Sequence, residues 1–360
     1  MHLPVWFDGK GPDAEIVVST RVRVARNLAG HRFLTRVTPQ ERTAIYKKIA
    51  GSLGSQPDFK SFVIVNFSAV SGLERQLLVE KKVTGPDLQN CEGTRGVAHD
   101  HCYRVNMIIN AEDHLCISCI DSGFRPAEMW NLADSIDERL GRKLDFAYDQ
   151  GRGFLTCRPI DSGSGLRVSF LMHLPGLVLT RSIDAIVQGA STMGVAVSGF
   201  FSGHSGVIGN FILLSSNAAA GMPETEFIDS TRRVIAEVVC CEREARQRLI
   251  REARLELTDR IYRAYGILRH ARTLSVAEYM NLASALRLGC DTGLFTEISL
   301  TDLNQSMFLV MPAHLQYRLK RTMDEAECGV ARAEFVSWLL NKKRKRSCIN
   351  LAEYRDETLI

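Results

Sequence analysis

The chain has 360 residues, of which 45% are hydrophobic and 24% are charged, and its formal net charge is +4. This is the composition of a globular protein with a sizeable core, and so small a positive excess does not indicate a nucleic-acid partner. The sequence shows neither a basic segment followed by an apolar run at its start nor about 18 successive apolar residues, so we expect no signal peptide, no membrane span, and reduced cysteines in a cytoplasm.

The first two-thirds of the chain alternate short apolar runs with glycine and polar breaks, a pattern typical of strands. Between these runs lie segments with helical periodicity, and the first of them has Thr38 as a candidate N-cap and Pro39 at the first helical position. The pattern predicts a mixed sheet carrying helices. The predicted strands are 15–18, 61–66, 104–110, 114–120, 153–157, 195–201 and 210–214, and the predicted helices are 39–53, 126–140 and 182–193.

Two cysteines, Cys116 and Cys119, form a C-x-x-C pattern inside the predicted strand 114–120. A zinc site or a redox pair is one interpretation of this spacing. No second cysteine pair follows at zinc-finger spacing, so we favour two side chains of a buried strand.

The pattern changes near residue 224, where apolar residues begin to recur at a period close to 3.6 and continue to about residue 270. This predicts a long helix broken once, with a coiled coil as an alternative. A helical block follows, in which Ser275 and Glu278 form a capping-box pattern, residues 300–304 open a further helix and residues 332–340 close the block.

These patterns predict a division of the chain into four parts. We expect a first domain at 1–223, a connecting helix at 224–265, a helical domain at 266–341 and a basic tail at 342–360. A run of like charges at a chain end is typically solvated, and contact with nucleic acid or an acidic partner is the alternative.

Three separated segments combine arginines, glycines and a carboxylate. Residues 19–28 (STRVRVARNL), 110–115 (NAEDHL) and 163–167 (GSGLR) supply Arg21, Arg23, Arg167 and Glu112. Planar guanidinium groups fit phosphate oxygens two at a time. A nearby carboxylate is a candidate base for phosphoryl transfer. The combination favours a nucleotide-dependent kinase that lacks a P-loop.

Together with four further segments these motifs resemble, in the same order, the ATP:guanido phosphotransferases (phosphagen kinases), and among them the bacterial protein arginine kinases. The further segments are 153–156 (GFLT), 172–175 (MHLP), 265–272 (YGILRHAR) and 286–289 (LRLG). The resemblance implies an α+β fold. Its catalytic domain would contain a mixed, largely antiparallel sheet flanked by helices, and a small all-helical domain would follow.

The resemblance further implies ATP-dependent phosphorylation of arginine residues in proteins. Glu112 is then the catalytic base, ATP is the phosphoryl donor, and Mg²⁺ is bound through the nucleotide rather than by protein side chains. The resemblance also implies a set of nucleotide-binding residues. They are Ser19, Thr20, Arg21, Val22, Arg23, Arg167, Val168, Ser169, Phe170 and Leu171.

Several positions depart from the family pattern. Cys116 and Ser198 replace arginines, and Gly203 replaces a glutamate that clamps the substrate. Lys82 and Arg158 stand where the family has a histidine and a reactive cysteine, and they are candidates for compensating cations. A catalytically impaired pseudokinase, acting as a nucleotide-binding or dimeric regulator, is therefore the alternative interpretation.

The arginine replacing the reactive cysteine, Arg158, follows Cys157 directly. Neighbouring residues of a strand point to opposite faces, so we do not expect Cys157 to take over the role of the missing cysteine.

The last part of the chain retains only a fragment of the family's phosphoarginine-binding motif, Arg-Asp-x-x-Arg-Ala. In residues 328–333 (CGVARA) it keeps Arg332 and Ala333, so we predict a degenerate regulatory site at Arg332. The resemblance implies a cytoplasmic homodimer without a membrane association. Its expected partners are proteins with accessible arginines, a protease or chaperone system and a stress-response repressor. The C-terminal resemblance disfavours a kinase of small guanidino compounds.

Overall fold

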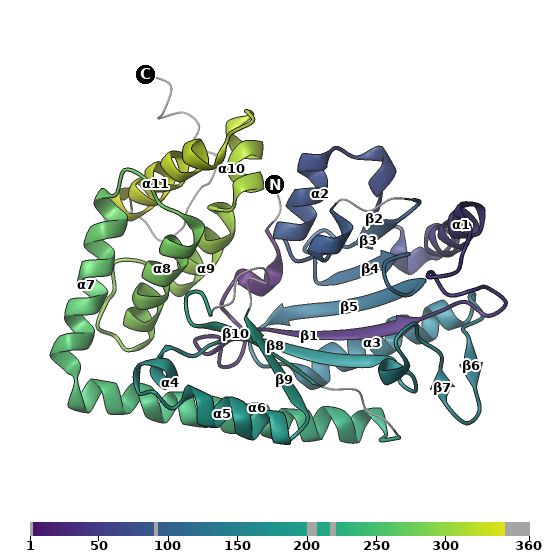
Figure 1. The fold of residues 1–360 in the computed structure, drawn as a ribbon, viewed down its shortest axis with the longest axis horizontal. Coiled ribbons are helices and arrows are strands. Elements are labelled where there is room, and N and C mark those ends of the chain that lie inside the picture. The colour runs from purple at the N-terminus through teal and green to yellow at the C-terminus, as the bar shows by residue number, and fades with distance from the viewer. Residues whose placement is uncertain (1–2, 90–92, 200–206, 217–220, 343–360) are drawn as a thin grey trace. The chain divides into compact units, whose positions relative to one another are not determined.

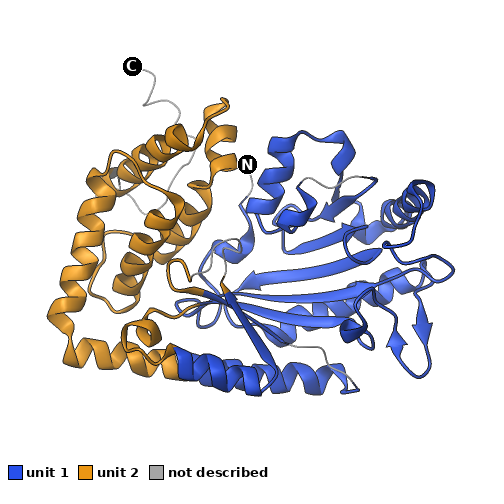
Figure 2. Cartoon of the chain, viewed as in Figure 1, with its two compact units in different colours: residues 1–172, 184–198, 212–240 blue, residues 173–183, 199–211, 241–360 orange. Residues whose placement is uncertain are grey.

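The computed structural model describes residues 3–89, 93–199, 207–216 and 221–342 (Figure 1). The chain forms two compact units, each built from three segments (Figure 2). Unit 1 comprises Met1–Met172, Asp184–Ser198 and Ile212–Cys240, and unit 2 comprises His173–Ile183, Gly199–Phe211 and Cys241–Ile360. The predicted division at residues 223, 265 and 341 remains a prediction.

An eight-stranded sheet with the order β2-β3-β4-β5-β1-β8-β10-β9 is the centre of unit 1 (Figure 1). Strand β1 pairs antiparallel with β5 on one side and with β8 on the other. The sheet strands are β1 (Val17–Arg26), β2 (Val63–Asn66), β3 (Gly96–His99), β4 (Val105–Ile109), β5 (Leu115–Ser122), β8 (Leu166–His173), β9 (Val195–Gly199) and β10 (Phe211–Ser216). A separate hairpin is formed by β6 (Tyr148–Asp149) and β7 (Gly153–Phe154).

Most predicted strands are confirmed, with shifted ends. The first is longer than predicted because Arg21 and Arg23 alternate with Val22 and Val24, which are 0% exposed, so the strand continues through the charged segment. The run at 153–157 yields only the two residues of β7. Strand β3 was not predicted, because its four buried residues begin with a glycine and are too few to show a period.

Helix α3 (Pro126–Gly141) covers one face of the sheet, where it packs on β1 and β5. Its buried residues Met129, Ala133, Ile136 and Leu140 recur at helical spacing and present an apolar stripe. Burial of this stripe removes apolar surface from water, which stabilises the fold by about 25 cal/mol for each Å² that is buried. The face of β1 that α3 covers therefore belongs to the hydrophobic core, and the opposite face is available for a functional site.

Helix α1 (Pro39–Ser55) begins as predicted, with Thr38 accepting from the N–H of Glu41 in a capping box. Helix α2 (Gly72–Glu80) was not predicted, although Ser71 and Glu74 form a capping box that marks its start. Two short helices, α4 (Pro175–Leu179) and α5 (Ile183–Thr192), follow β8.

The predicted long helix with one break is confirmed. Helix α6 (Glu224–Glu252) and helix α7 (Arg254–His270) are separated by Ala253, whose backbone angles are φ −139° and ψ 37°. These angles lie outside the helical region, so the regular hydrogen-bond ladder ends there.

Unit 2 contains a bundle in which α7 packs on α8 and α11, and α10 packs on α11 and α9. Ser275 caps α8 as predicted, accepting from the N–H of Glu278. No helix in the described part of the chain has the length and apolarity that a membrane span requires. The bundle helices after α7 are α8 (Val276–Asp291), α9 (Leu300–Leu309), α10 (Pro312–Leu319) and α11 (Glu325–Lys342).

A buried ion cluster joins the segments of unit 2. The carboxylate of Glu242, 0% exposed, accepts from the N–H groups of Gly176 and Leu177 at 2.9 Å and from Nε of Arg246 at 2.7 Å. Arg246 also donates to Asp291 at 2.6 Å and to the carbonyl of His173 at 2.9 Å. Because these buried charges are bonded to each other and to the backbone, the cluster is a structural brace.

Candidate functional site

Arg21 and Arg23 of β1 lie on the face opposite α3, whereas Arg26 at the end of the strand bonds Asp137 of α3. Neighbouring residues of a strand point to opposite faces, so Arg21 and Arg23 share one face while Val22 and Val24 share the other. On the neighbouring strand β8, Arg167 is directly opposite Arg23. Like charges placed opposite each other across two strands repel. Such a pair is expected where an anion is to be bound.

The side chains of Arg21 and Arg23 are held differently. Arg21 donates to the carbonyl of Lys82 at 2.6 Å, and burial together with the charge of Arg23 lowers the pKa of Arg21 to about 9. It remains charged at neutral pH. Nε of Arg23 is buried and has no hydrogen-bond partner among the described residues. A buried donor without a partner is disfavoured, so a ligand oxygen would stabilise this arrangement.

Arg23 and Arg167 border a cavity of about 220 Å³ on the open face of the sheet. Gly165 lies in the wall of this cavity and approaches the backbone of β1 closely. The φ of Gly165 is +65°, and a Cβ at this position would lie 2.5 Å from the carbonyl oxygen of Ala25. Only glycine fits at that position. The lining residues are Arg23, Ala25, Gly85, Asp87, Leu88, Ile108, Ala111, Glu112, Asp113, Cys116, Asp161, Gly165 and Arg167.

Glu112 reaches this cavity from the turn between β4 and β5. Asn110 holds the start of the turn, with φ 61° and Nδ2 donating to the carbonyls of Arg42 and Thr94. Asp113, 7% exposed, holds its end by accepting from Nδ2 of Asn27 at 2.6 Å and from the N–H of Cys157 at 2.7 Å.

His114 completes the support of this turn. Its Nδ1 accepts from the N–H of Leu28, so its proton is on Nε2, which donates to the carbonyl of Arg32. Burial lowers the pKa of His114, in agreement with a neutral ring. The neighbours of Glu112 thus hold the loop, and its own side chain, 60% exposed, is left for chemistry.

The electrostatic surroundings of Glu112 are mixed. Desolvation raises the pKa of its carboxyl, and the nearby charge of Arg158 opposes that shift. Nε of Arg158 lies 3.8 Å from Glu112 and 3.6 Å from Asp161, and Asp161 accepts from Nη2 of Arg167 at 2.8 Å. Sequence reasoning missed Asp161, whose only sequence signal is its position three residues after Arg158.

The structure brings together part of the predicted nucleotide-binding set. By strand register, Ser19, Arg21, Arg23, Arg167, Ser169 and Leu171 share the open face. Thr20, Val22, Val168 and Phe170 point to the covered face, where Thr20 donates to the carbonyl of Gly123 at 2.6 Å and accepts from the N–H of Arg125. The side chains on the covered face position the strands.

Four departures from the family pattern belong to unit 1, namely Lys82, Cys116, Arg158 and Ser198. Cys116 lies half-buried in the cavity wall opposite Ala25, and burial raises the pKa of its thiol. Cys116 and Cys119 both lie on β5, as predicted for a strand. Ser198 is exposed on β9. Gly203 lies outside the described residues.

The substituted position Lys82, and Cys157 directly before the substituted position Arg158, lie in loops beside the site. Lys82 has φ 54°, and burial and the charge of Arg21 lower its pKa to about 8. Burial raises the pKa of Cys157 to about 12, so its thiol is protonated at neutral pH.

Arg332, predicted to form a degenerate phosphoarginine site, is only 2% exposed. Its guanidinium donates to the carbonyl of Val310 at 2.9 Å and to the carbonyl of Leu274. These bonds join three segments of unit 2, so the side chain acts as an internal brace here and gives the prediction no support.

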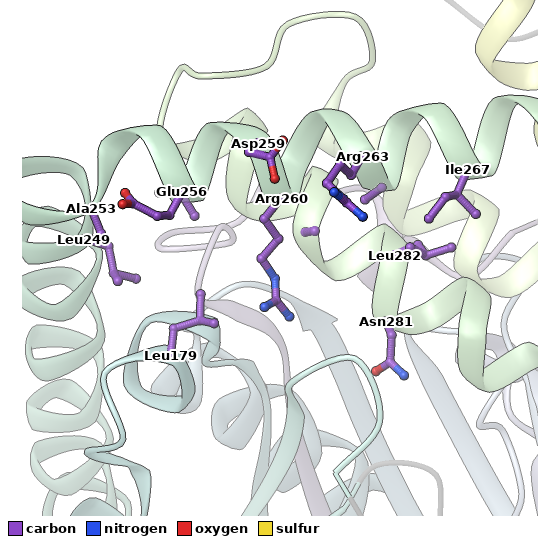
Figure 3. Close-up of a pocket in the computed structure, with 13 residues that line it drawn as sticks. Leu179, Leu249, Ala253, Glu256, Asp259, Arg260, Arg263, Ile267, Asn281 and Leu282 are labelled. Carbon is purple, nitrogen blue, oxygen red and sulfur yellow. The ribbon is translucent and has the colours of Figure 1, made fainter.

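A larger cavity of about 470 Å³ lies in unit 2 among α4, α6, α7 and α8 (Figure 3). Its walls include Leu179, Leu249 and Leu282, and Arg260 extends from α7 toward Leu179. This lining mixes aliphatic side chains with Glu256, Asp259, Arg260 and Arg263, whereas the cavity of unit 1 has arginines opposed across paired strands and Glu112, so we place the phosphate chemistry there. Within the residues that the structure describes, no group of three His, Cys, Asp or Glu side chains could hold a metal ion.

Solved structures share this fold. A lombricine kinase aligns with a TM-score of 0.57 at 18% identity, covering 67% of this chain and 71% of that one. A duplicated taurocyamine kinase from Schistosoma mansoni aligns with a TM-score of 0.57 at 20% identity, covering 74% of this chain and 39% of that one. The sequence model of the ATP:guanido phosphotransferase C-terminal catalytic domain matches residues 44–245. The fold is therefore that of a phosphagen kinase, as predicted.

The sequence comparisons identify a branch of this class. The model of the protein-arginine kinase McsB C-terminal domain matches residues 254–350. A protein-arginine kinase from Moorella thermoacetica is 36% identical over 338 residues, covering 93% of this chain and 97% of the relative. One from Bacillus subtilis is 33% identical, covering 93% and 92%. The chain belongs to the protein-arginine kinase family of ATP:guanido phosphotransferases.

Proposed function

We propose that this protein transfers the γ-phosphoryl group of ATP to a guanidinium nitrogen of arginine residues in proteins. The observation that carries the proposal is a single cavity in which Arg23 and Arg167 oppose each other across two strands and Glu112 reaches in from a braced turn. The protein-arginine kinases at 33–36% identity support the same reaction.

The proposed roles follow from the chemistry of the groups. Arg21, Arg23 and Arg167 neutralise the phosphates as charge develops in the transition state. Glu112 orients the substrate guanidinium, which is protonated and a poor nucleophile, and takes the proton that it loses. The N–P bond forms as the bond between the γ-phosphorus and the bridging oxygen breaks, and ADP leaves. Backbone groups of residues 167–171 line the nucleotide.

We propose that Mg²⁺ enters on the nucleotide. When bound there, it neutralises charge on the β- and γ-phosphates. Mg²⁺ usually keeps several waters and takes phosphate oxygens of the nucleotide as ligands, so we assign no protein side chain to the ion.

The test is incubation of the purified protein with ATP, Mg²⁺ and an unfolded basic protein, followed by mass spectrometry for acid-labile phosphoarginine. We expect phosphoarginine with the wild type and a background signal with Glu112→Ala. Nucleotide-dependent thermal stabilisation without any phosphoarginine would contradict the proposal and favour the alternative, a catalytically impaired pseudokinase that acts as a nucleotide-binding regulator.

The remaining expectations from the resemblance are part of the same proposal. We propose a cytoplasmic homodimer that marks protein substrates for a protease or chaperone system and acts on a stress-response repressor. We also retain the division at residues 223, 265 and 341 as a proposal. Sedimentation equilibrium tests the dimer, and a monomer at all concentrations would contradict it.

A further inference from the structure

The side chain of Arg158 approaches two carboxylates, Glu112 and Asp161, that line the cavity of unit 1. Its Nε is 3.8 Å from Oε1 of Glu112 and 3.6 Å from Oδ2 of Asp161. Both distances exceed the usual limit of about 3.2 Å for an N–H···O hydrogen bond. With 45% of the Arg158 side chain exposed, this guanidinium is attracted to both acids and held tightly by neither.

The Asp161 carboxylate, in contrast, is fixed. It is 16% exposed and ends a short turn (Pro159–Asp161), in which its own N–H donates to the carbonyl of Arg158 at 2.9 Å. Thr156 donates to the same carbonyl at 2.7 Å. Both carboxylate oxygens accept from Nη2 of Arg167, at 2.8 and 3.0 Å.

The two carboxylates therefore differ in one respect and agree in another. The side chain of Glu112 is exposed and that of Asp161 is held by Arg167, yet both line the same cavity as Arg23. A carboxylate has about four acceptor sites, so the pairing with Arg167 leaves Asp161 able to accept from a second cation. A planar guanidinium with five donors suits a place between two such acids.

We infer that the space between Glu112 and Asp161 binds the guanidinium of the substrate arginine, with Asp161 as its second carboxylate and Arg158 as an internal stand-in that the substrate displaces. The inference rests on the proposed function and names a specificity-determining residue for it. Because Asp161 also bonds Arg167, it connects the guanidinium place to the phosphate-binding arginine.

The rival interpretation is that Asp161 only positions Arg167. The two interpretations predict different affinities. A substrate carboxylate affects the binding of an arginine ligand, whereas a positioning residue affects the binding of nucleotide through Arg167. A variant of Arg158 provides a second test. If Arg158 is a stand-in it competes with the substrate arginine for the two carboxylates, whereas a cation that compensates for a missing phosphate-binding arginine would not compete.

The experiment is equilibrium binding of a labelled peptide containing one arginine, in the presence of ADP, Mg²⁺ and nitrate as a planar mimic of the phosphoryl group. The same peptide with citrulline, a neutral isostere of arginine, measures binding that does not depend on the guanidinium. A fluorescent ADP analogue gives the nucleotide Kd separately. Thermal melts establish that each variant is folded, and Asp149→Asn, an exposed aspartate of the β6–β7 hairpin, is the matched control.

For Asp161→Asn we expect the arginine-peptide Kd to rise about tenfold or more, as for loss of a hydrogen bond to a charged group, with the nucleotide Kd changed much less. Asp161→Glu, which keeps the charge, should recover part of the affinity. Arg158→Gln should tighten peptide binding. The control and the citrulline peptide should show no such changes.

Equal weakening of peptide and nucleotide in Asp161→Asn, or an unchanged peptide Kd, would overturn the inference. So would weaker peptide binding in Arg158→Gln, or no binding of the arginine peptide by the wild type. The assay needs no turnover. Peptide binding that depends on Asp161 without phosphoarginine would therefore reject the proposed function alone, and phosphoarginine formation unaffected in Asp161→Asn would reject this inference alone.

Discussion

Two arginine–carboxylate clusters of this protein contain the same kinds of side chain but differ in how closely the charges are paired and how deeply they are buried. In unit 2, Arg246 bonds Glu242 at 2.7 Å and Asp291 at 2.6 Å, and Glu242 is fully buried. In unit 1, Arg158 approaches its two acids no closer than 3.6 Å, and 45% of its side chain is exposed.

This difference in pairing distinguishes a cluster that supports the fold from a cluster that can bind a ligand. The cluster of unit 2 uses its donors and acceptors on each other and on backbone groups, so it has nothing to offer a ligand. The cavity of unit 1 retains a buried Nε of Arg23 without a partner in the described structure and an exposed carboxylate at Glu112. Charges left incompletely paired in a cavity are typical of a functional site.

The largest expected effect is on stability, in the cluster of unit 2. Glu242→Ala leaves Arg246 buried beside one remaining acid, and removal of one partner of a buried pair costs about 3–5 kcal/mol of the free energy of unfolding. Denaturant unfolding measures it. A loss no larger than that of an exposed ion pair would show that the cluster is not a brace.

In the cavity, the expected effect is on turnover instead. Arg23→Ala should lower the rate of phosphotransfer about 10³-fold, by analogy with the loss of a transition-state arginine. The free energy of unfolding should change little, because the buried Nε loses no partner within the described chain. Kinetics and unfolding on the same preparation test both halves, and Arg142→Ala, an exposed arginine after α3, is the control.

Lys82 is expected to give a smaller, pH-dependent effect. Burial and the charge of Arg21, opposed by Glu80, lower its pKa from 10.5 to about 8. Between these values the unfolded chain binds more protons than the folded one, so the contribution of Lys82 makes stability rise as pH increases from about 8 to about 10.5. Lys82→Met should reduce this rise in unfolding experiments across that range. An unchanged pH profile would contradict the assignment.

The smallest effect is expected for an exposed pair on the same helix as Glu242. Arg248 and Glu252 in α6 have the same spacing as Glu242 and Arg246, but their side chains are 61% and 59% exposed. Arg248→Ala should change the free energy of unfolding far less than Glu242→Ala does, because solvent screens an exposed pair. A loss comparable to that of Glu242→Ala would remove burial as the cause of the difference.

Sequence patterns anticipated the elements whose signals are local. Proline and threonine at the start of α1, and the break between α6 and α7, follow from capping and periodicity. The motifs also predicted that Arg21, Arg23, Arg167 and Glu112 belong together, and the strand register now places Arg23 opposite Arg167.

Other features required the folded chain. The pleat of β1 and β8 divides the predicted nucleotide set between two faces, which only the register of paired strands determines. Asp161 could not be predicted as a site residue from the sequence. It stands out only because the fold places it beside Arg158 and Arg167 and near Glu112, which comes from a turn far away in sequence. Arg332 could not be predicted as a buried brace because its carbonyl partners lie on other segments.

The most direct measurement is the rate of phosphoarginine formation by Glu112→Gln relative to Glu128→Gln. The two glutamates have side chains that are 60% and 57% exposed, and Glu128 lies in the first turn of α3. If Glu112 is the base of an arginine kinase, its variant should be slower by about 10²–10⁴-fold, while Glu128→Gln retains the wild-type rate. Equal rates in the two variants, or no phosphoarginine from the wild type, would contradict the account.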